Sequence, residues 1–137
     1  MDKALANRLI DEILAAEPNL ARLSVLCTRN EWRDLRRRIA MIMASYVDMT
    51  MVIVRRFPDL DPDREDAKRR PLNPVARPNL SEIGAVLREA KADLGKVSAL
   101  ADHIRAEGER RAFREHVAEA SSLYQAVADA VAQGPTP

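Results

Sequence analysis

The chain has only two histidines and one cysteine, so few side chains could act as proton carriers near neutral pH or as thiol nucleophiles. His103 and His116 lie on either side of a turn predicted near Glu109, so neighbouring helices would bring them to a similar depth. Glu107 or Glu119 would then be nearby, and histidine can exchange protons near neutral pH. The alternative is that both histidines are half-exposed on solvated helix surfaces, and we favour it.

Sequence motifs for metals, phosphates and cofactors are absent. The four glycines are scattered and cannot form a phosphate-binding loop. The single cysteine, Cys27, excludes a cysteine-based zinc site and an internal disulfide. His116 and Glu119 have the reverse order of the Glu-x-x-His motif of di-iron bundles, and no matching pair accompanies them. The sequence therefore predicts no metal and no cofactor.

One short motif points to an enzymatic alternative. Residues 111–116 read Arg-Ala-Phe-Arg-Glu-His, an arginine and a histidine separated by four residues. This spacing resembles the signature of HEPN ribonuclease domains, small helical bundles in which the arginine and histidine of two protomers meet in a dimer cleft and cleave RNA. The resemblance implies that Arg111 would hold the scissile phosphate and His116 would move protons. Ala112 stands where that family usually has a polar residue. The alternative interpretation is a charged helix face with local ion pairs.

A basic patch offers a second alternative, because residues 29–57 contain more arginines than acids. Its candidate members lie on or near one helical face beside Trp32: Arg29, Arg33, Arg36 and Arg37. Such a patch would bind nucleic-acid phosphates without reading their sequence. We favour pairing of these arginines with acids of the same chain or of a partner protein. The formal net charge of +1 gives the chain as a whole no attraction for nucleic acid.

The elements that would position these residues are predicted to be helices. Aromatic residues are 4% of the chain and glycines are few, which disfavours a β-sandwich or barrel. Apolar residues recur at helical spacing over residues 2–16, 29–57, 80–106 and 110–132. Pro18 is expected to break the first helix, and a turn or kink is expected at Gly108. We therefore predict an all-α fold, an antiparallel four-helix bundle that forms a single domain over residues 1–137.

A proline-rich linker divides the predicted bundle into two helical halves. Residues 58–79 contain five of the eight prolines, a density that favours extended chain. This segment is expected to serve as a long crossover connection between the helical half 1–57 and the helical hairpin 80–132. Residues 133–137 are expected to form a disordered tail.

The helix predicted over residues 29–57 is apolar on nearly all sides between residues 39 and 54. This stretch is too short to cross a bilayer and carries Asp48 near its middle, which argues against membrane insertion. One rod of a four-helix bundle should retain a polar stripe, so another surface is expected to cover part of this helix. The predicted partner-binding residues are Ile39, Ile42, Met43, Tyr46, Met49 and Ile53.

These patterns together predict a non-enzymatic helical adaptor or regulator that acts through apolar helix faces as a homo-oligomer. The chain begins with an amphipathic pattern instead of an apolar signal peptide and has a free thiol, so the cytoplasm is the expected compartment. Its compactness suggests a bacterial source. The ribonuclease using Arg111 and His116 and the nucleic-acid-binding module remain open as alternatives.

Overall fold

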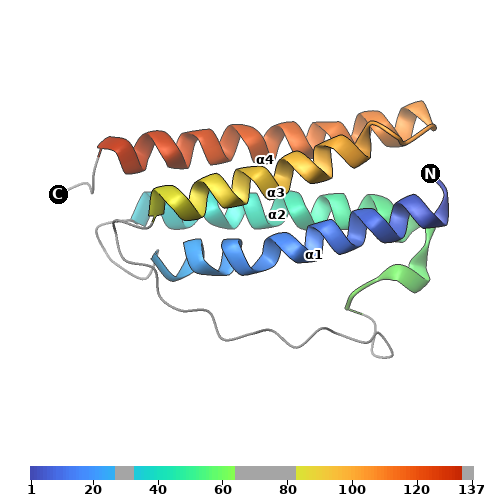
Figure 1. The fold of residues 1–137 in the computed structure, drawn as a ribbon, viewed down its shortest axis with the longest axis horizontal. Helices are drawn as coiled ribbons and strands as arrows, with labels where there is room; N and C mark the ends of the chain where they lie inside the picture. The colour runs from blue at the N-terminus through green and yellow to red at the C-terminus, as the bar shows by residue number, and fades with distance from the viewer. Residues whose placement is uncertain (27–32, 64–82, 134–137) are drawn as a thin grey trace.

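The computed structural model describes residues 1–26, 33–63 and 83–133 of the chain. These residues form four α-helices: α1 (Lys3–Leu26), α2 (Arg33–Arg56), α3 (Ile83–Ala101) and α4 (Glu107–Gln133). A short 3-10 helix, η2 (Pro58–Leu60), follows α2, and no strand occurs in this part of the chain. The predicted all-α class and four-helix bundle are confirmed (Figure 1).

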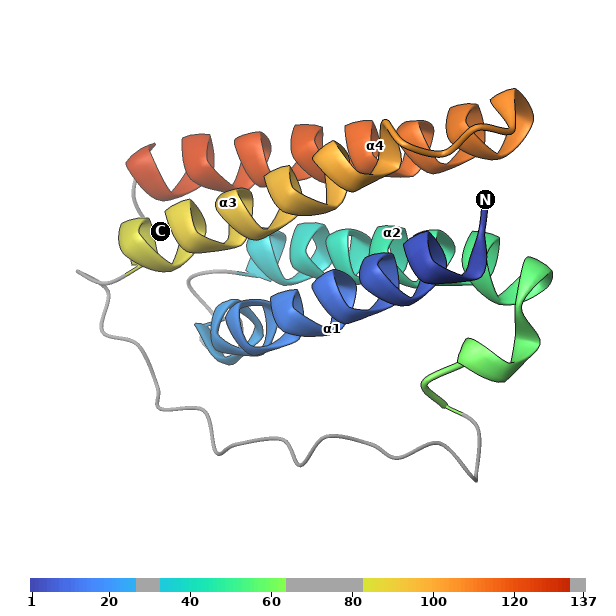
Figure 2. The ribbon, with the colours of Figure 1, turned by 45° about the vertical axis from the view of Figure 1, so that its right-hand side comes forward.

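The helices form a ring in which each helix packs against two others. Helix α1 contacts α2 and α3, and α4 contacts the same two helices. All neighbouring pairs are antiparallel, whereas α2 and α3 run in the same direction on opposite sides of the ring (Figures 1 and 2). The end of α2 and the start of α3 therefore lie at opposite ends of the bundle. This placement fits the predicted crossover connection, of which residues 64–79 lie outside the described part.

One apolar core extends along the bundle, as the helical spacing predicts. The seam predicted in the third helix is buried from Ile83 through Leu94 to Ala101, and Ile104 continues it beyond the helix. The last helix buries Phe113, Val117 and Tyr124 at the predicted spacing. Each large apolar side chain buried in this way stabilises the fold by about 1.5–3 kcal/mol.

The predicted break at Pro18 is not observed, because α1 is one helix that contains this proline. Pro18 lies on the exposed side of the helix, so the Leu14 carbonyl that loses its amide donor is close to water. Residues on both sides of the proline, including Ile13 and Leu20, remain buried in the same core. Continuous burial along one face offsets the loss of a single backbone hydrogen bond.

The predicted turn or kink at Gly108 is not observed, because this glycine is the second residue of α4. The chain reverses direction before it. The turn spans residues 102–106, around the fully buried side chain of Ile104. The Ile104 amide donates to the Ala101 carbonyl at 3.1 Å, and the Arg110 guanidinium donates to the Ile104 carbonyl at 3.0 Å. An anchored apolar side chain, and not a glycine, determines where the chain turns.

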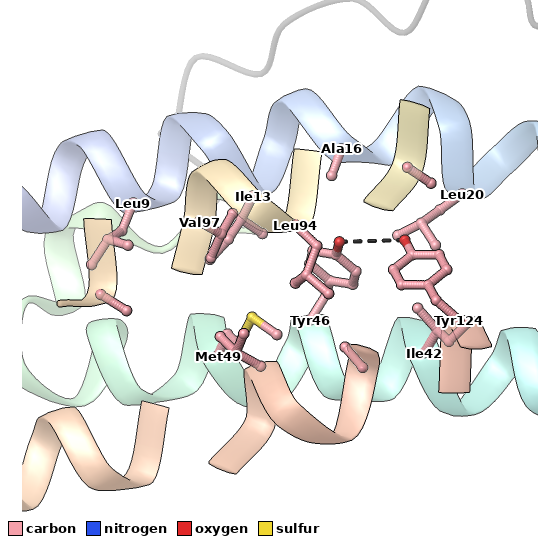
Figure 3. Close-up of a cluster of buried hydrophobic side chains, with 14 of the residues drawn as sticks. Leu9, Ile13, Ala16, Leu20, Ile42, Tyr46, Met49, Leu94, Val97 and Tyr124 are labelled. Carbon is pink, nitrogen blue, oxygen red and sulfur yellow. Dashed lines mark hydrogen bonds between the residues drawn. The ribbon is translucent and has the colours of Figure 1, made fainter. Parts of the chain in front are cut away.

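A pair of tyrosines links α2 to α4 inside the core. The hydroxyls of Tyr46 and Tyr124 lie 3.3 Å apart and share a hydrogen bond (Figure 3). Burial raises the pKa of both phenols, and for Tyr46 the hydrogen bond to Tyr124 partly opposes this rise in pKa. The shared hydrogen bond gives each buried hydroxyl a partner.

We predict that the two tyrosine hydroxyls are strongly coupled. Tyr124→Phe should lower the free energy of unfolding by about 1–3 kcal/mol, because it leaves the Tyr46 hydroxyl buried without its partner. The double variant Tyr46→Phe/Tyr124→Phe should lose less than the two single variants summed, since no orphaned hydroxyl remains. Urea unfolding of the four proteins measures this coupling. Simple additivity would contradict it.

We also predict that Pro18→Ala stabilises the protein. Alanine restores an amide donor for the Leu14 carbonyl, and its helix propensity exceeds that of proline by about 3 kcal/mol. The greater freedom of the unfolded alanine chain cancels part of this gain, so the net increase in unfolding free energy should be about 1–2 kcal/mol. A decrease in the urea midpoint would show that α1 is not continuous through residue 18.

Candidate interaction surface

Helix α2 has an inner face that belongs to the core of its own bundle. The Ile39, Ile42, Tyr46, Met49 and Ile53 side chains are all buried there. Figure 3 shows Ile42, Tyr46 and Met49 among side chains of the other helices. Of the residues predicted to bind a partner, only Met43 is therefore exposed. The prediction selected the face of α2 that the bundle itself covers.

The opposite face of α2 is apolar and open to water. We define the outer strip as Ala40, Met43, Ala44, Val47 and Met51; Met41 is also exposed but lies about 160° around the helix from Met43, on the far side of Asp48. Val47 is 60% exposed, and the three methionines are 42–44% exposed. Within the described residues, these are all of the large apolar side chains that are exposed. The predicted partner-binding set omits Met41, Val47 and Met51, although Val47 and Met51 follow Met43 at intervals of four residues in the sequence.

The outer strip has a defined relief. Met43, Val47 and Met51 follow one another at intervals of four residues and form a ridge along the helix. Ala40 and Ala44 form a parallel row with much smaller side chains, and both are exposed. The ridge therefore lies beside a row of small side chains that is bounded by the exposed residues Arg36 and Asp48.

Charged residues mark the ends and one edge of the outer strip. Arg36 and Arg37 are exposed at its N-terminal end, and Arg55 is exposed at its C-terminal end. On the edge that faces α4, Asp48 Oδ2 lies 3.9 Å from His116 Nδ1. The outer strip is thus apolar along its length, with arginines at both ends and the exposed Asp48 carboxylate along the α4 edge near its middle.

Backbone-directed contacts fix the rotation of α2 and hence the direction of the outer strip. The Arg38 guanidinium donates to the Ala126 carbonyl of α4 at 3.4 Å. The buried Ser45 hydroxyl donates to the Met41 carbonyl at 3.2 Å, so this polar side chain is satisfied within its own helix. The Arg38 contact and the tyrosine pair join α2 to α4, so these two contacts hold the apolar outer face toward water.

The residues of the ribonuclease hypothesis point to different sides of α4. Arg111 is mostly exposed, and its guanidinium lies 3.5 Å from Glu107. His116 is half-buried beside Asp48 of α2, whereas His103 is exposed in the turn before α4. Arg111 and His116 are five positions apart, which places them about 140° apart around the helix. A single chain does not bring them together.

Only part of the predicted basic patch lies within the described residues. Arg29 and Trp32 lie outside the described residues, and Arg33 begins α2. Arg36 and Arg37 are exposed. The described residues contain no group of three or more histidine, cysteine or acidic side chains arranged to hold a metal ion. No described helix has the length and hydropathy needed to cross a membrane.

Comparison with known proteins found no match to this chain among protein-family models, curated proteins or solved structures. The inference of function therefore rests on the chemistry of the chain's own surface.

We predict that two methionines of α2 differ sharply in their contribution to folding. Met49→Ala should lower the unfolding free energy by about 2–5 kcal/mol, because it opens a cavity in the core. Met51→Ala should change it by less than about 1 kcal/mol, since that side chain is on the outer strip. Urea unfolding in dilute solution compares the two. Equal losses would show that the assignment of inner and outer faces is wrong.

Proposed function

We propose that this chain is a non-enzymatic protein-interaction module that pairs with a second copy through the outer strip of α2. The observation that carries this proposal is that all exposed large apolar side chains of the described residues belong to α2, and three of the four, Met43, Val47 and Met51, form one row along it. Contiguous apolar surface of this kind is typical of interaction sites in water-exposed proteins.

The relief of the outer strip supports a second copy as the partner. A two-fold interface uses the same surface on both subunits, so that surface must be complementary to itself. The row of Met43, Val47 and Met51 meets this requirement, because Met43 and Met51 flank Val47 at equal intervals of four residues. Ridges of this type interdigitate when two helices cross at about 50°.

A two-fold axis near Val47 gives a specific set of contacts. In an antiparallel crossing, Met43 of one copy lies opposite Met51 of the other, and the two Val47 side chains meet. Methionine suits such a contact because its unbranched thioether chain adapts to irregular gaps. The residue types are thus arranged almost symmetrically about Val47.

The arginines at the two ends are compatible with this pairing. Arg36 and Arg55 lie about 16 Å and 12 Å from Val47 along the helix. Two helices that cross near Val47 diverge toward their ends, so these charges remain in water, where salt screens their repulsion over about 8 Å. The apolar centre is covered while the charged ends stay solvated.

Such a dimer would act as an adaptor or regulatory subunit. The polar outer faces of α3 and α4 would remain available to further partners in this dimer. In the expected cytoplasmic compartment, Cys27 would stay reduced. The ribonuclease alternative has no comparable support among the described residues, in which Arg111 contacts Glu107 and lies about 140° around α4 from His116. No contact among the described residues favours the nucleic-acid alternative.

We predict that Val47→Glu abolishes pairing without unfolding the chain. Sedimentation equilibrium of the unmodified protein should show mass rising from one chain toward two as concentration increases. Near the two-fold axis, the variant would bury two like charges, so the dissociation constant should rise about 100-fold or more. Circular dichroism should show unchanged helicity, because residue 47 is exposed in the single chain.

Ala99→Glu is the matched control, since it adds the same charge at an exposed position of α3. It should leave the dissociation constant within about threefold of the original value, as expected for a charge remote from the contact. A protein that is monomeric at every concentration would contradict self-association. A dimer that tolerates Val47→Glu would show that pairing uses another surface.

A further inference from the structure

The methionines of α2 differ in exposure in a way that bears on their chemistry. Met41, Met43 and Met51 are 42–44% exposed, whereas Met49 is fully buried on the same helix. A thioether sulfur in contact with water is open to attack by oxidants, and a buried one is shielded until the structure opens. The outer strip therefore combines an apolar contact surface with the accessible sulfur atoms of Met43 and Met51, and Met41 adds a third accessible sulfur on the other side of Asp48.

We propose that Met41, Met43 and Met51 are sites of reversible oxidation to methionine sulfoxide by hydroperoxides. In each step, a sulfur lone pair attacks the terminal peroxide oxygen, so an S–O bond forms as the O–O bond breaks. The thioether gives up two electrons, and hydrogen peroxide is reduced to water. Reduction by a thiol-dependent sulfoxide reductase restores the thioether and forms water and a disulfide in the reductant.

The consequence for pairing follows from the polarity of the product. A sulfoxide oxygen is a strong hydrogen-bond acceptor, and the outer strip of a second copy offers it alanine, valine and methionine side chains beside the Asp48 carboxylate, which is also an acceptor. In the single chain, water can hydrogen-bond to the same oxygen, so oxidation changes the free energy of unfolding little. Oxidation is thus a switch that opposes pairing and leaves the bundle folded. This step rests on the proposed function, whereas the choice of oxidised residues rests on exposure alone.

The first experiment measures which sulfurs react. The dilute protein is treated with hydrogen peroxide, quenched, and digested with trypsin. Residues 39–55 form one tryptic peptide that contains all four methionines of α2, so fragment ions compare them within the same molecule. Met41, Met43 and Met51 should oxidise on the order of tenfold faster than Met49, which reacts only through opening of the core. In urea, the four rates should become equal.

Two results would overturn the assignment of the sites. Oxidation of Met49 as fast as Met43 in the folded chain would show that burial does not separate them. Resistance of all four, with rapid reaction in urea, would show that another part of the chain covers the outer strip.

The second experiment measures the switch. Sedimentation equilibrium after selective oxidation should show a dissociation constant raised at least about tenfold, as expected for burying unpaired polar groups, with helicity unchanged. The triple variant Met41→Leu/Met43→Leu/Met51→Leu keeps an apolar strip, so it should pair normally before and after peroxide. Met49→Leu is the matched control and should remain peroxide-sensitive. Both variants retain Cys27, which separates any effect of that thiol.

The outcomes separate the switch from the proposed function. A dimer that persists after oxidation of all three methionines would overturn the switch and leave self-association intact. Selective oxidation of a chain that is monomeric throughout would overturn self-association, and the switch with it, while upholding the three oxidation sites.

Discussion

Helix α2 is apolar on two opposite faces, and the packing of a four-helix bundle can cover only one of them. The inner face, with Ile42, Tyr46 and Met49, is buried among the other helices. On the outer face, the Met43, Val47 and Met51 side chains are 42–60% exposed to water. Covering the rest of these side chains in two copies would contribute about 1 kcal/mol each. Because association also costs translational and rotational freedom, this amount supports reversible pairing.

The core determines which face of α2 remains available. The hydrogen bond between Tyr46 and Tyr124 and the contact from Arg38 to the Ala126 carbonyl set the rotation of α2 against α4. A rotation of α2 that brought Val47 inward would expose Met49 and separate the tyrosine hydroxyls. The outer strip is therefore a consequence of core packing, and its position is as well defined as the core itself.

Much of the fold could be predicted from the sequence because helical periodicity reports burial directly. The seam from Ile83 to Ala101 and the stripe from Phe113 to Val127 are buried as predicted, since each has one apolar face. Local chain-breaking signals were less informative. Pro18 lies inside a helix that the core holds together, and the turn near Ile104 follows an anchored side chain instead of the nearby Gly108.

The interaction surface could be predicted only in part, for a physical reason. Periodicity shows that α2 has two apolar faces, but it cannot show which face the other helices cover. The longer run of large side chains through Ile42 and Met49 fills the core, and the alternative run through Met43 and Val47 is left outside. The excess of apolar surface was visible in the sequence, whereas its location depended on how α2 meets α1 and α4.

Contacts between methionine methyl groups of two different copies test the central claim most directly. In a mixture of isotope-labelled and unlabelled chains, an isotope-filtered nuclear Overhauser experiment detects only contacts between copies. Met43 and Met51 lie about 12 Å apart along one helix, too far for such a contact within a single chain. The account predicts a cross-peak between the Met43 methyl of one copy and the Met51 methyl of the other. Absence of this cross-peak at concentrations where the chain is dimeric, or a chain that never dimerises, would contradict it.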